Sequence, residues 1–519
     1  MIKEKGKYYQ FLTSKNGDVV PAIVDANGVV RSLHSLFAPQ KEAERIIAGD
    51  SGAEHNGYLV LLGFGGGYIA EAALAKNDIY HVLVIDYCKE GFEEIIAHKD
   101  FSSMLSNKKL HILLDPSKGE IETHILSTYN PTLHGGLRTI PLRTRCDADT
   151  EDFNASYDAL KSALDKVKGD YSVQVHFGKR WFSNIIRNLY AAEKQLSFDI
   201  PMHNAAICAA GPSLDGQLEE IKKEQADNNF FVLATDTSLG TLLQANIKPD
   251  AIVSMDCQHI SYYHFVGYTK EIKDIPLFLD IASPSLLSKL SNKVFFFLSA
   301  HPLCSYIEKH FRNLPRLDTS GANVTYASLS LAQKAGAKNI KVFGADFSYP
   351  QGCAYTRGAY FYPYFDRSAC RLKPVEQSLA AFLYRSPSLK MIIRDIEKSG
   401  RIEKSWCYQT ASLKMYQDAF EKKLSELHSE PRSASALFSS GSLKTSAKDF
   451  LQTYRKKISS LDNDINEGFS SNLELWNSLL PAASTIRHKQ KISNIDETAE
   501  ETKKFALRVI EKLLQKTDN

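Results

Sequence analysis

Apolar runs that stop at a glycine or an acidic residue recur through the middle of this 519-residue chain. One such run closes the stretch Thr319–Tyr349, where a start rich in small residues, an amphipathic segment and a glycine precede IKVFGADFSY. Strands buried on both faces of a parallel sheet read as unbroken apolar runs, and ligands of open parallel sheets bind at the carboxyl ends of strands. The recurrence therefore predicts a nucleotide-type crevice. The runs are Asn204–Asp215, Phe230–Ser238, Asp250–Gln258 and Ile340–Ser348.

Length and charge narrow the classes of protein to which the chain can belong. Its 519 residues exceed the roughly 250–300 at which a single hydrophobic core stops growing, so two or three domains are expected. The formal net charge is +3, from 63 basic and 60 acidic side chains, and this lacks the basic excess that marks nucleic-acid binding. We therefore expect no nucleic-acid partner.

Cysteine spacing and hydropathy indicate the cellular compartment in which the protein is expected. The eight cysteines are scattered without CxxC spacing, which argues against a zinc site and a disulfide framework and fits a reducing cytoplasm. The N-terminus has no signal-like apolar stretch, and no window approaches the ~20 apolar residues of a bilayer-spanning helix. The chain is expected to be soluble and cytoplasmic, without a transmembrane segment.

Composition changes along the chain predict four segments. Residues 1–150 combine hairpin turns at Asn16-Gly17 and Asn27-Gly28 with a βαβ pattern, and residues 151–200 form a charged, helical connector. Residues 201–372 alternate strands and helices, which is typical of a doubly wound parallel sheet. Residues 373–519 are rich in helix formers, with a Ser-rich loop at 429–447. The predicted fold class is α/β, with a Rossmann-like N-terminal domain, a central doubly wound domain and a helical C-terminal domain.

A glycine-rich turn lies inside the predicted N-terminal βαβ unit. It follows a strand at Tyr58–Leu62, and the next strand ends in Asp86, where a ribose hydroxyl is often held. S-adenosylmethionine or a nucleotide is the ligand class expected there. Alternatively, the glycines only permit a tight turn and close helix packing. The candidate residues of this N-terminal site are Gly63, Gly65, Gly67 and Asp86.

Two stretches of the central segment have the pattern of phosphate and ribose sites. Gly211-Pro212-Ser213 follows a buried strand and opens a helix, so its amides can face a phosphate. Alternatively, it is a turn with Ser213 as N-cap. Asp236 and Asp256 each end a strand, where a carboxylate accepts ribose hydroxyls, holds a divalent cation or caps the next helix.

A second predicted helix start follows Thr319-Ser320-Gly321. The positive end of this helix is suited to a phosphate or a base edge, and the alternative is that Ser320 is a plain N-cap.

The loop after Asp346 is rich in phenols and guanidinium groups. Both donate hydrogen bonds to a leaving phosphate without a metal, and Arg357 is the first candidate among them. The alternative is an aromatic interface or a loop folded over its own core. The predicted catalytic residues are Asp346, Tyr355, Arg357, Tyr362 and Asp366.

Several of these segments together resemble the motility-associated factor (Maf) flagellin glycosyltransferases and their MptE-like relatives. The GPSL and GADF motifs are also similar to those of bacterial sialyltransferases that use CMP-activated sugars. The resemblance covers about residues 200–372, and the Gly-rich unit before it is similar to the N-terminal domain of Maf proteins. The segments are AAGPSLD, FFVLATDTSLGTLLQANIKPDAIVSMDCQ and TSGANVTYASLSLAQKAGAKNIKVFGADFSY.

The resemblance implies a fold, an activity and a donor site. It implies a GT-A-like nucleotide-sugar domain that transfers a nonulosonic acid, of the pseudaminic or legionaminic type, from a CMP-sugar donor to Ser or Thr of flagellin. Whether a divalent metal takes part is left open. The phosphate loop maps onto Gly211, Pro212 and Ser213. The other predicted donor-binding residues are Asp236, Asp256, Ser320, Gly321, Asn323, Asp346 and Phe347.

The sequence departs from the related sialyltransferases at the general base. Those enzymes place a histidine after the GADF-type strand, whereas here no histidine follows Asp346 until His428. His259, His264 and Asp366 are the candidate bases. Two other functions stay open: a 6-hydroxymethylpterin diphosphokinase that uses ATP and magnesium, and a flagellin-binding factor without activity.

Overall fold

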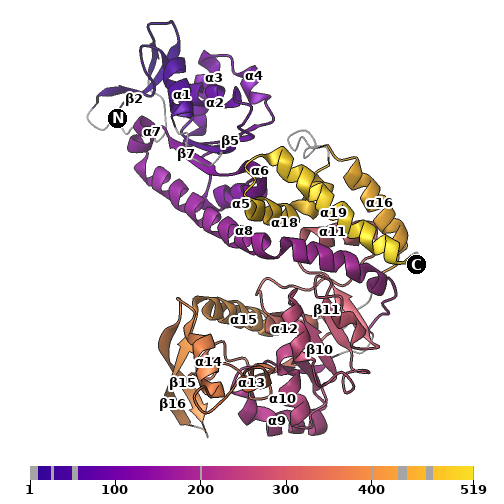
Figure 1. The fold of residues 1–519 in the computed structure, drawn as a ribbon. Coiled ribbons are helices and arrows are strands. Elements are labelled where there is room, and N and C mark those ends of the chain that lie inside the picture. The colour runs from indigo at the N-terminus through magenta and orange to yellow at the C-terminus, as the bar shows by residue number, and fades with distance from the viewer. Residues whose placement is uncertain are drawn as a thin grey trace. The chain divides into compact units, whose positions relative to one another are not determined.

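The computed structural model describes residues 10–24, 28–49, 56–198, 202–398, 401–429, 441–462 and 472–517 (Figure 1). The chain divides into two compact units, each assembled from separate stretches of sequence. The boundary falls within the long helix α8 (Thr150–Glu193), whereas the sequence placed a domain start near residue 200. The four predicted segments stay a prediction. Unit 1 is Met1–Gly178, Leu461–Leu473 and Leu480–Thr502, and unit 2 is Lys179–Ser460, Glu474–Leu479 and Lys503–Asn519.

Unit 1 begins with a small antiparallel sheet in the order β1-β2-β3. Its strands are β1 (Gln10–Thr13), β2 (Val19–Val24) and β3 (Val30–Ser32). The first turn is the predicted one, because Gly17 adopts the positive φ of 86° that the hairpin requires. Asn27 of the second predicted turn lies outside the described residues.

A four-stranded parallel sheet in the order β6-β5-β4-β7 forms the centre of unit 1. Every residue of β4 and β5 is buried, because helices cover both faces of the sheet. Leu59 and Leu61 pack with α1 to α3, while Val60 and Leu62 pack with α5 and α8. The strand predicted at Tyr58–Leu62 and the strand end predicted at Asp86 are confirmed, whereas the strand at Leu137–Pro141 was not predicted. The strands are β4 (Tyr58–Leu62), β5 (His81–Asp86), β6 (Leu110–Leu114) and β7 (Leu137–Pro141). The helices are α1 (Pro39–Ala48), α2 (Tyr68–Leu74), α3 (Lys89–His98), α4 (Ser102–Leu105), α5 (Lys118–Thr128), α6 (Pro131–His134) and α7 (Arg143–Ala148).

Unit 2 is built on a six-stranded, entirely parallel sheet in the order β12-β11-β10-β9-β8-β13. The chain starts at β8, moves outward strand by strand to β12, and then returns to place β13 on the other side of β8. The topological switch point of the sheet therefore lies between β8 and β13. The strands are β8 (Asn204–Cys208), β9 (Phe231–Thr235), β10 (Ala251–Ser254), β11 (Leu277–Asp280), β12 (Val294–Phe297) and β13 (Asn339–Phe343).

Helices cover both faces of this sheet as well. Ala205 and Ile207 of β8 pack with α12 and with Phe420 of α15, whereas Ala206 and Cys208 pack with α9 and α10. The α/β fold with parallel sheets is thus confirmed. The connecting elements are α9 (Leu214–Asp227), η1 (Asp236–Ser238), α10 (Leu239–Gln244), η2 (His259–His264), η3 (Leu287–Lys289), α11 (Pro302–His310) and α12 (Val324–Lys334).

The predicted helical C-terminal region is confirmed, but it also holds a hairpin that the sequence analysis missed. β15 and β16 pair with each other, and β16 also pairs with β14 through Tyr349 and Tyr408. The Ser-rich loop predicted at 429–447 falls mostly outside the described residues. The elements are β14 (Tyr349–Pro350), α13 (Phe361–Asp366), α14 (Val375–Tyr384), β15 (Lys390–Lys398), β16 (Arg401–Gln409), α15 (Ala411–Ser429), α16 (Ala447–Ser459), α18 (Leu473–Gln490) and α19 (Ile495–Thr517). In the described part of the chain, no helix has the length and apolar character needed to cross a membrane.

Candidate functional site

A cavity of about 230 Å³ lies at the switch point of the unit 2 sheet. We call it the switch-point cavity. Its walls come from the loops after β8 and β13, the end of β9, the start of α12, the aromatic loop after β14, and α15. Of the side chains that line it, Asp346 alone carries a charge. The predicted site residues among them are Gly211, Asn323, Asp346, Phe347 and Tyr355.

Gly211 allows the loops after β8 and β13 to meet. The Gly211 amide donates to the carbonyl of Gly344 at 2.7 Å. A Cβ atom on Gly211 would lie 2.1 Å from Oδ2 of Asp346 and 2.5 Å from that carbonyl, so no larger residue fits. Contact between these loops therefore depends on glycine at this position.

The carboxylate of Asp346 occupies the place at the start of α9 where the sequence put a phosphate. The Ser213 amide donates to Oδ2 of Asp346 at 2.9 Å. Ser213 stands at the N-cap position but makes no side-chain capping bond, so the alternative of a plain N-cap does not describe it. Loss of water around Asp346 raises the pKa of its carboxyl group, while hydrogen bonds from Ser213 oppose the rise. A proton-accepting group thus faces the switch-point cavity.

Asp236 shapes the cavity from behind its wall. Both carboxylate oxygens accept hydrogen bonds: Oδ1 from the Thr237 amide at 2.7 Å, and Oδ2 from the Ser254 hydroxyl at 2.6 Å. Asp236 is buried, and its neighbours Thr235 and Thr237 line the cavity instead. Asp236 therefore orients Thr237, and its oxygens are already engaged.

At the start of α12 the capping residue is Asn323, whereas the sequence analysis considered Ser320. Asn323 Oδ1 accepts from the Tyr326 amide at 2.9 Å. Ser320 is exposed and donates its hydroxyl to Asp318 at 2.7 Å, outside the cavity lining. A Cβ on Gly321 would lie 2.2 Å from the Tyr326 ring, so this glycine serves packing.

The aromatic loop is anchored to α9 by Asp215. The Asp215 carboxylate accepts from the Thr356 hydroxyl and from the Arg357 amide, the latter at 3.3 Å. The Thr356 amide also donates to the Ala210 carbonyl at 3.0 Å. This anchoring places Tyr355 in the cavity wall, where burial raises the pKa of its phenol far above the usual range. Tyr355 is therefore a neutral hydrogen-bond donor.

The other predicted catalytic residues lie in or beside this loop, outside the cavity lining. Arg357 and Asp366 are exposed, and the Tyr362 hydroxyl donates to the Tyr355 carbonyl at 3.3 Å. The ring of the candidate base His264 packs edge-on against Tyr360 at 4.7 Å. Arg357 and Asp366 thus lie on the surface, whereas Tyr362 and His264 are half-buried beside the loop.

The two remaining strand-end candidates also lie outside the lining. Asp256 is exposed and accepts from the Gln258 amide at 2.9 Å, and the candidate base His259 is exposed on η2. Pro212 sits with Ser213 in the turn that opens α9, and neither lines the cavity.

Functional residues that the sequence analysis missed come from the hairpin and α15. Arg394 of β15 donates to the Asp346 carbonyl at 2.8 Å, and Gln409 of β16 donates to the Phe347 carbonyl at 2.9 Å. Leu413 and Tyr416 of α15 line the cavity. These residues follow Asp346 by 48 or more positions, and their sequence carries no motif that links them to it.

Gly211→Ala tests the contact between the two loops. We expect it to lower the free energy of unfolding of unit 2 by roughly 1–3 kcal/mol, because an added methyl group forces backbone shifts in a packed site. Chemical denaturation followed by tryptophan fluorescence measures this, since all three tryptophans lie in unit 2. Gly216→Ala is the control: it adds a methyl with no atom within 4 Å inside α9 and should stabilise by up to about 1 kcal/mol. Equal effects of the two variants would contradict the interpretation.

The N-terminal glycine turn is filled by the protein's own side chains. A Cβ on Gly63 would lie 3.0 Å from Arg145, one on Gly65 2.5 Å from His34, and one on Gly67 2.7 Å from Phe101. The Gly66 amide donates to Nε2 of His34 at 2.9 Å. The geometry favours the alternative in which the glycines permit close packing.

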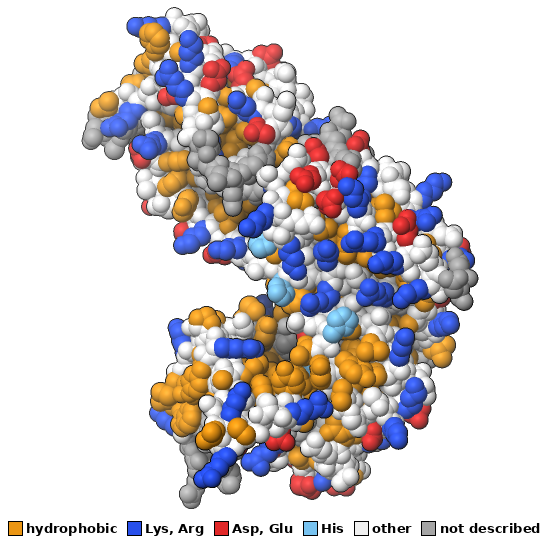
Figure 2. Space-filling view, in the orientation of Figure 1, with side chains coloured by type: hydrophobic (Ala, Val, Ile, Leu, Met, Phe, Trp, Pro, Cys, Tyr) orange, Lys and Arg blue, Asp and Glu red, His pale blue; other side chains and the backbone are white. Residues whose placement is uncertain are grey.

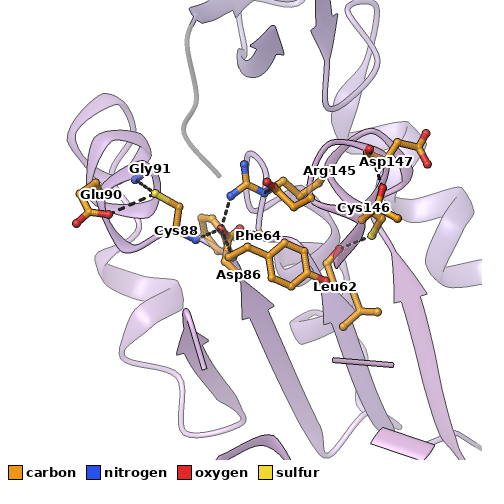
Figure 3. Close-up of polar contacts among 12 residues, drawn as sticks. Leu62, Phe64, Asp86, Cys88, Glu90, Gly91, Arg145, Cys146 and Asp147 are labelled. Carbon is orange, nitrogen blue, oxygen red and sulfur yellow. Dashed lines mark hydrogen bonds and ion pairs between the residues drawn. The ribbon is translucent and has the colours of Figure 1, made fainter. Parts of the chain in front are cut away.

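The carboxylate of Asp86 is likewise bound by the protein's own groups (Figure 3). The side chains of Asp86 and Arg145 are both 0% exposed and form an ion pair at 2.9 Å. Asp86 also accepts from the amides of Phe64 and Tyr87, each at 2.8 Å. Its carboxylate binds the loop and a buried guanidinium at the position where a ribose was predicted.

Comparison with known proteins agrees with the fold. Residues 179–352 match the family described as 6-hydroxymethylpterin diphosphokinase MptE-like. The Maf glycosyltransferase from Magnetospirillum magneticum AMB-1 aligns over 99% of this chain and 91% of its own, with a TM-score of 0.52 and 13% identity. The predicted resemblance is therefore confirmed: to Maf proteins in the fold, and to MptE-like proteins over the central segment.

Two sequence relatives come from Treponema pallidum (strain Nichols), and both are uncharacterised proteins. The first is 28% identical over 176 residues, which is 33% of this chain and 83% of the relative. The second is 34% identical over 97 residues, which is 19% of this chain and 34% of the relative.

Proposed function

We propose that this protein is a glycosyltransferase that moves a nonulosonic acid from a CMP-sugar donor to Ser or Thr of flagellin in the cytoplasm. The observation that carries the proposal is the switch-point cavity, which lies where α/β sheets bind nucleotides, in a chain with the fold of a Maf glycosyltransferase. The eight cysteines are all free, which supports a reducing compartment.

The cavity lining suits a donor whose nucleotide part carries a single phosphate. It presents backbone amides, hydroxyls and one carboxylate, and it contains no Lys or Arg. The phosphate of a CMP-sugar is a diester with one negative charge, whereas a nucleoside diphosphate sugar brings two charges that proteins usually offset with cations. At about 230 Å³ the cavity is below the usual range of ~300–1,000 Å³, so we assign it the CMP part of the donor, with the sugar outside it.

The chemistry follows from Asp346 and Tyr355. The acceptor hydroxyl oxygen attacks the anomeric carbon, the bond from that carbon to the phosphate oxygen breaks, and CMP leaves. In the proposed mechanism Asp346 takes the hydroxyl proton, since a raised pKa improves a carboxylate as a general base. Tyr355, kept neutral by burial, donates a hydrogen bond to the leaving phosphate.

A protein acceptor needs a docking surface, and unit 2 offers one beside the cavity. Figure 2 shows hydrophobic side chains gathered over the β15–β16 hairpin. Met391, Ile393 and Trp406 are 63%, 69% and 44% exposed. Exposed apolar groups of this kind mark interaction sites, and β16 pairs with β14, which supplies Tyr349 to the cavity wall.

The second candidate function is pterin diphosphokinase activity. The family match over residues 179–352 favours it. Such a reaction uses ATP with magnesium, and the sequence offers Asp236 and Asp256 as ligands. Both oxygens of Asp236 already accept hydrogen bonds, which makes it a poor ligand in this arrangement.

A binding experiment separates these functions. We expect CMP to raise the unfolding temperature without magnesium, and saturation at ~100 times the dissociation constant corresponds to about 2.7 kcal/mol. ATP and GTP, with and without magnesium, are the comparison ligands. A magnesium-dependent ATP shift favours the kinase, and no shift with any nucleotide favours a binding factor. Transfer from a CMP-nonulosonic acid to purified flagellin then tests the acceptor.

A further inference from the structure

Three histidines from different elements of unit 1 bring their ring nitrogens together. His81 opens β5, His111 lies in β6, and His124 lies in α5. One ligand nitrogen of each lies within 4.8 Å of the others. They are 30 and 13 residues apart in sequence, so only the fold makes them neighbours.

The closest pair already has the spacing of metal ligands. Nε2 of His124 and Nε2 of His81 are 3.4 Å apart. Zinc–nitrogen bonds of ~2.0–2.1 Å at a tetrahedral angle place two ligand nitrogens roughly 3.3–3.4 Å apart. The separation of these two nitrogens is therefore that of two ligands of one zinc ion.

The surroundings fix the ring of His81 and leave the ring of His111 able to turn. His81 is 7% exposed and is stacked between Tyr58 at 4.2 Å and His111 at 4.4 Å. The Tyr58 hydroxyl is hydrogen bonded to Thr128 at 2.8 Å, which fixes that side of the stack. Stacked rings direct their lone pairs in parallel, so binding requires His111 to turn. His111 is exposed, and a turn of its ring meets little resistance.

We propose that His81, His111 and His124 bind a divalent transition metal of the zinc class, with solvent at the fourth position. Imidazole ligands select zinc, cobalt, nickel and copper over magnesium and calcium, which prefer oxygen. The cysteine spacing argued against a zinc site, but this site uses no cysteine. The metal joins β5, β6 and α5 and so stabilises unit 1, independently of the switch-point cavity in unit 2.

The experiment is metal titration of the full chain without an affinity tag. We expect one equivalent of Zn²⁺ to bind by calorimetry and Co²⁺ to give the visible absorption of a four-coordinate site. His111→Ala and His124→Ala should each weaken binding at least ~10–100-fold, the loss that even an outer-shell change causes. His176→Ala removes an exposed histidine of the same unit outside the cluster and should bind as the wild type does.

A second readout separates loss of binding from loss of folding. Zinc should slow hydrogen exchange in β5 and β6 of the wild type and leave it unchanged in His111→Ala, whose exposed side chain can be removed without opening the core. Failure of zinc to bind stoichiometrically overturns the proposal. Wild-type affinity in both cluster variants, or equal protection by Mg²⁺, does so as well.

Discussion

Asp346→Asn is expected to lower the kcat of sugar transfer by about 10²–10⁴, the usual contribution of a general base. Asparagine keeps an acceptor for the Ser213 amide, which donates to Asp346 at 2.9 Å, and it keeps the shape of the side chain. What it removes is the negative charge that accepts the hydroxyl proton. KM for the donor and the unfolding temperature should therefore change little. Steady-state transfer from the CMP-sugar, beside a thermal melt, measures both.

Asp256→Asn is the matched control for this change. Asp256 also follows a strand of the same sheet, but it is exposed and does not line the switch-point cavity. We expect near wild-type kcat for this variant. If Asp346→Asn keeps its activity, or if Asp256→Asn loses as much, Asp346 is not the base.

Asp86→Asn is expected to destabilise unit 1 by about 3 kcal/mol, the lower end of the cost of breaking a buried ion pair, because Arg145 keeps Asp149 at 3.3 Å as a second partner. Asp86 and Arg145 are 2.9 Å apart, with both side chains 0% exposed. Hydrogen exchange of the β4 and β5 amides measures the change locally, because the tryptophans lie in unit 2. Protection should fall by roughly 100-fold or more.

Two further variants test whether the loss of stability comes from the buried charges. Asp158→Ala breaks an exposed pair with Lys118, at 3.7 Å with side chains 70% and 61% exposed, and should cost less than about 1 kcal/mol. Arg145 also pairs with buried Asp149 at 3.3 Å, so the triple variant Asp86→Leu, Arg145→Met and Asp149→Asn removes all three charges and should recover much of the loss. A stable Asp86→Asn protein would favour the other interpretation, in which Asp86 waits for a ribose.

The sequence predicted most of the strands, because their signal is local. A strand covered on both faces needs apolar side chains at every position, and Tyr58–Leu62 and His81–Asp86 show this in a short window. The hairpin Lys390–Gln409 gave no such signal, because it carries charges along both strands. Its second strand pairs with Tyr349–Pro350, which lie 57 to 59 residues before their partners, and this long-range pairing outweighed local propensity.

The candidate site divides in the same way. The glycine loop at 211–213 and the strand end at Asp346 were predicted to face one crevice, and both lie at the switch point. The sequence analysis also grouped Ser320, Asp256 and Arg357 with them, but these side chains lie outside the cavity lining. A motif locates a loop, whereas the direction of each side chain depends on neighbours that the motif does not contain.

By itself, the sequence determined the α/β class, the bounds of the buried strand Tyr58–Leu62 and the two loops that meet at the sheet's carboxyl edge. Burial periodicity and glycine turns are properties of a few adjacent residues, so they can be read without a fold. Tertiary structure alone decided that Asp346 occupies the start of α9, 133 residues from Ser213, and that Arg145 fills the place of a ribose beside Asp86. It also brought His81, His111 and His124 together. Such contacts join side chains that are far apart in the chain, and they form only when the packed strands and helices fix where each side chain points.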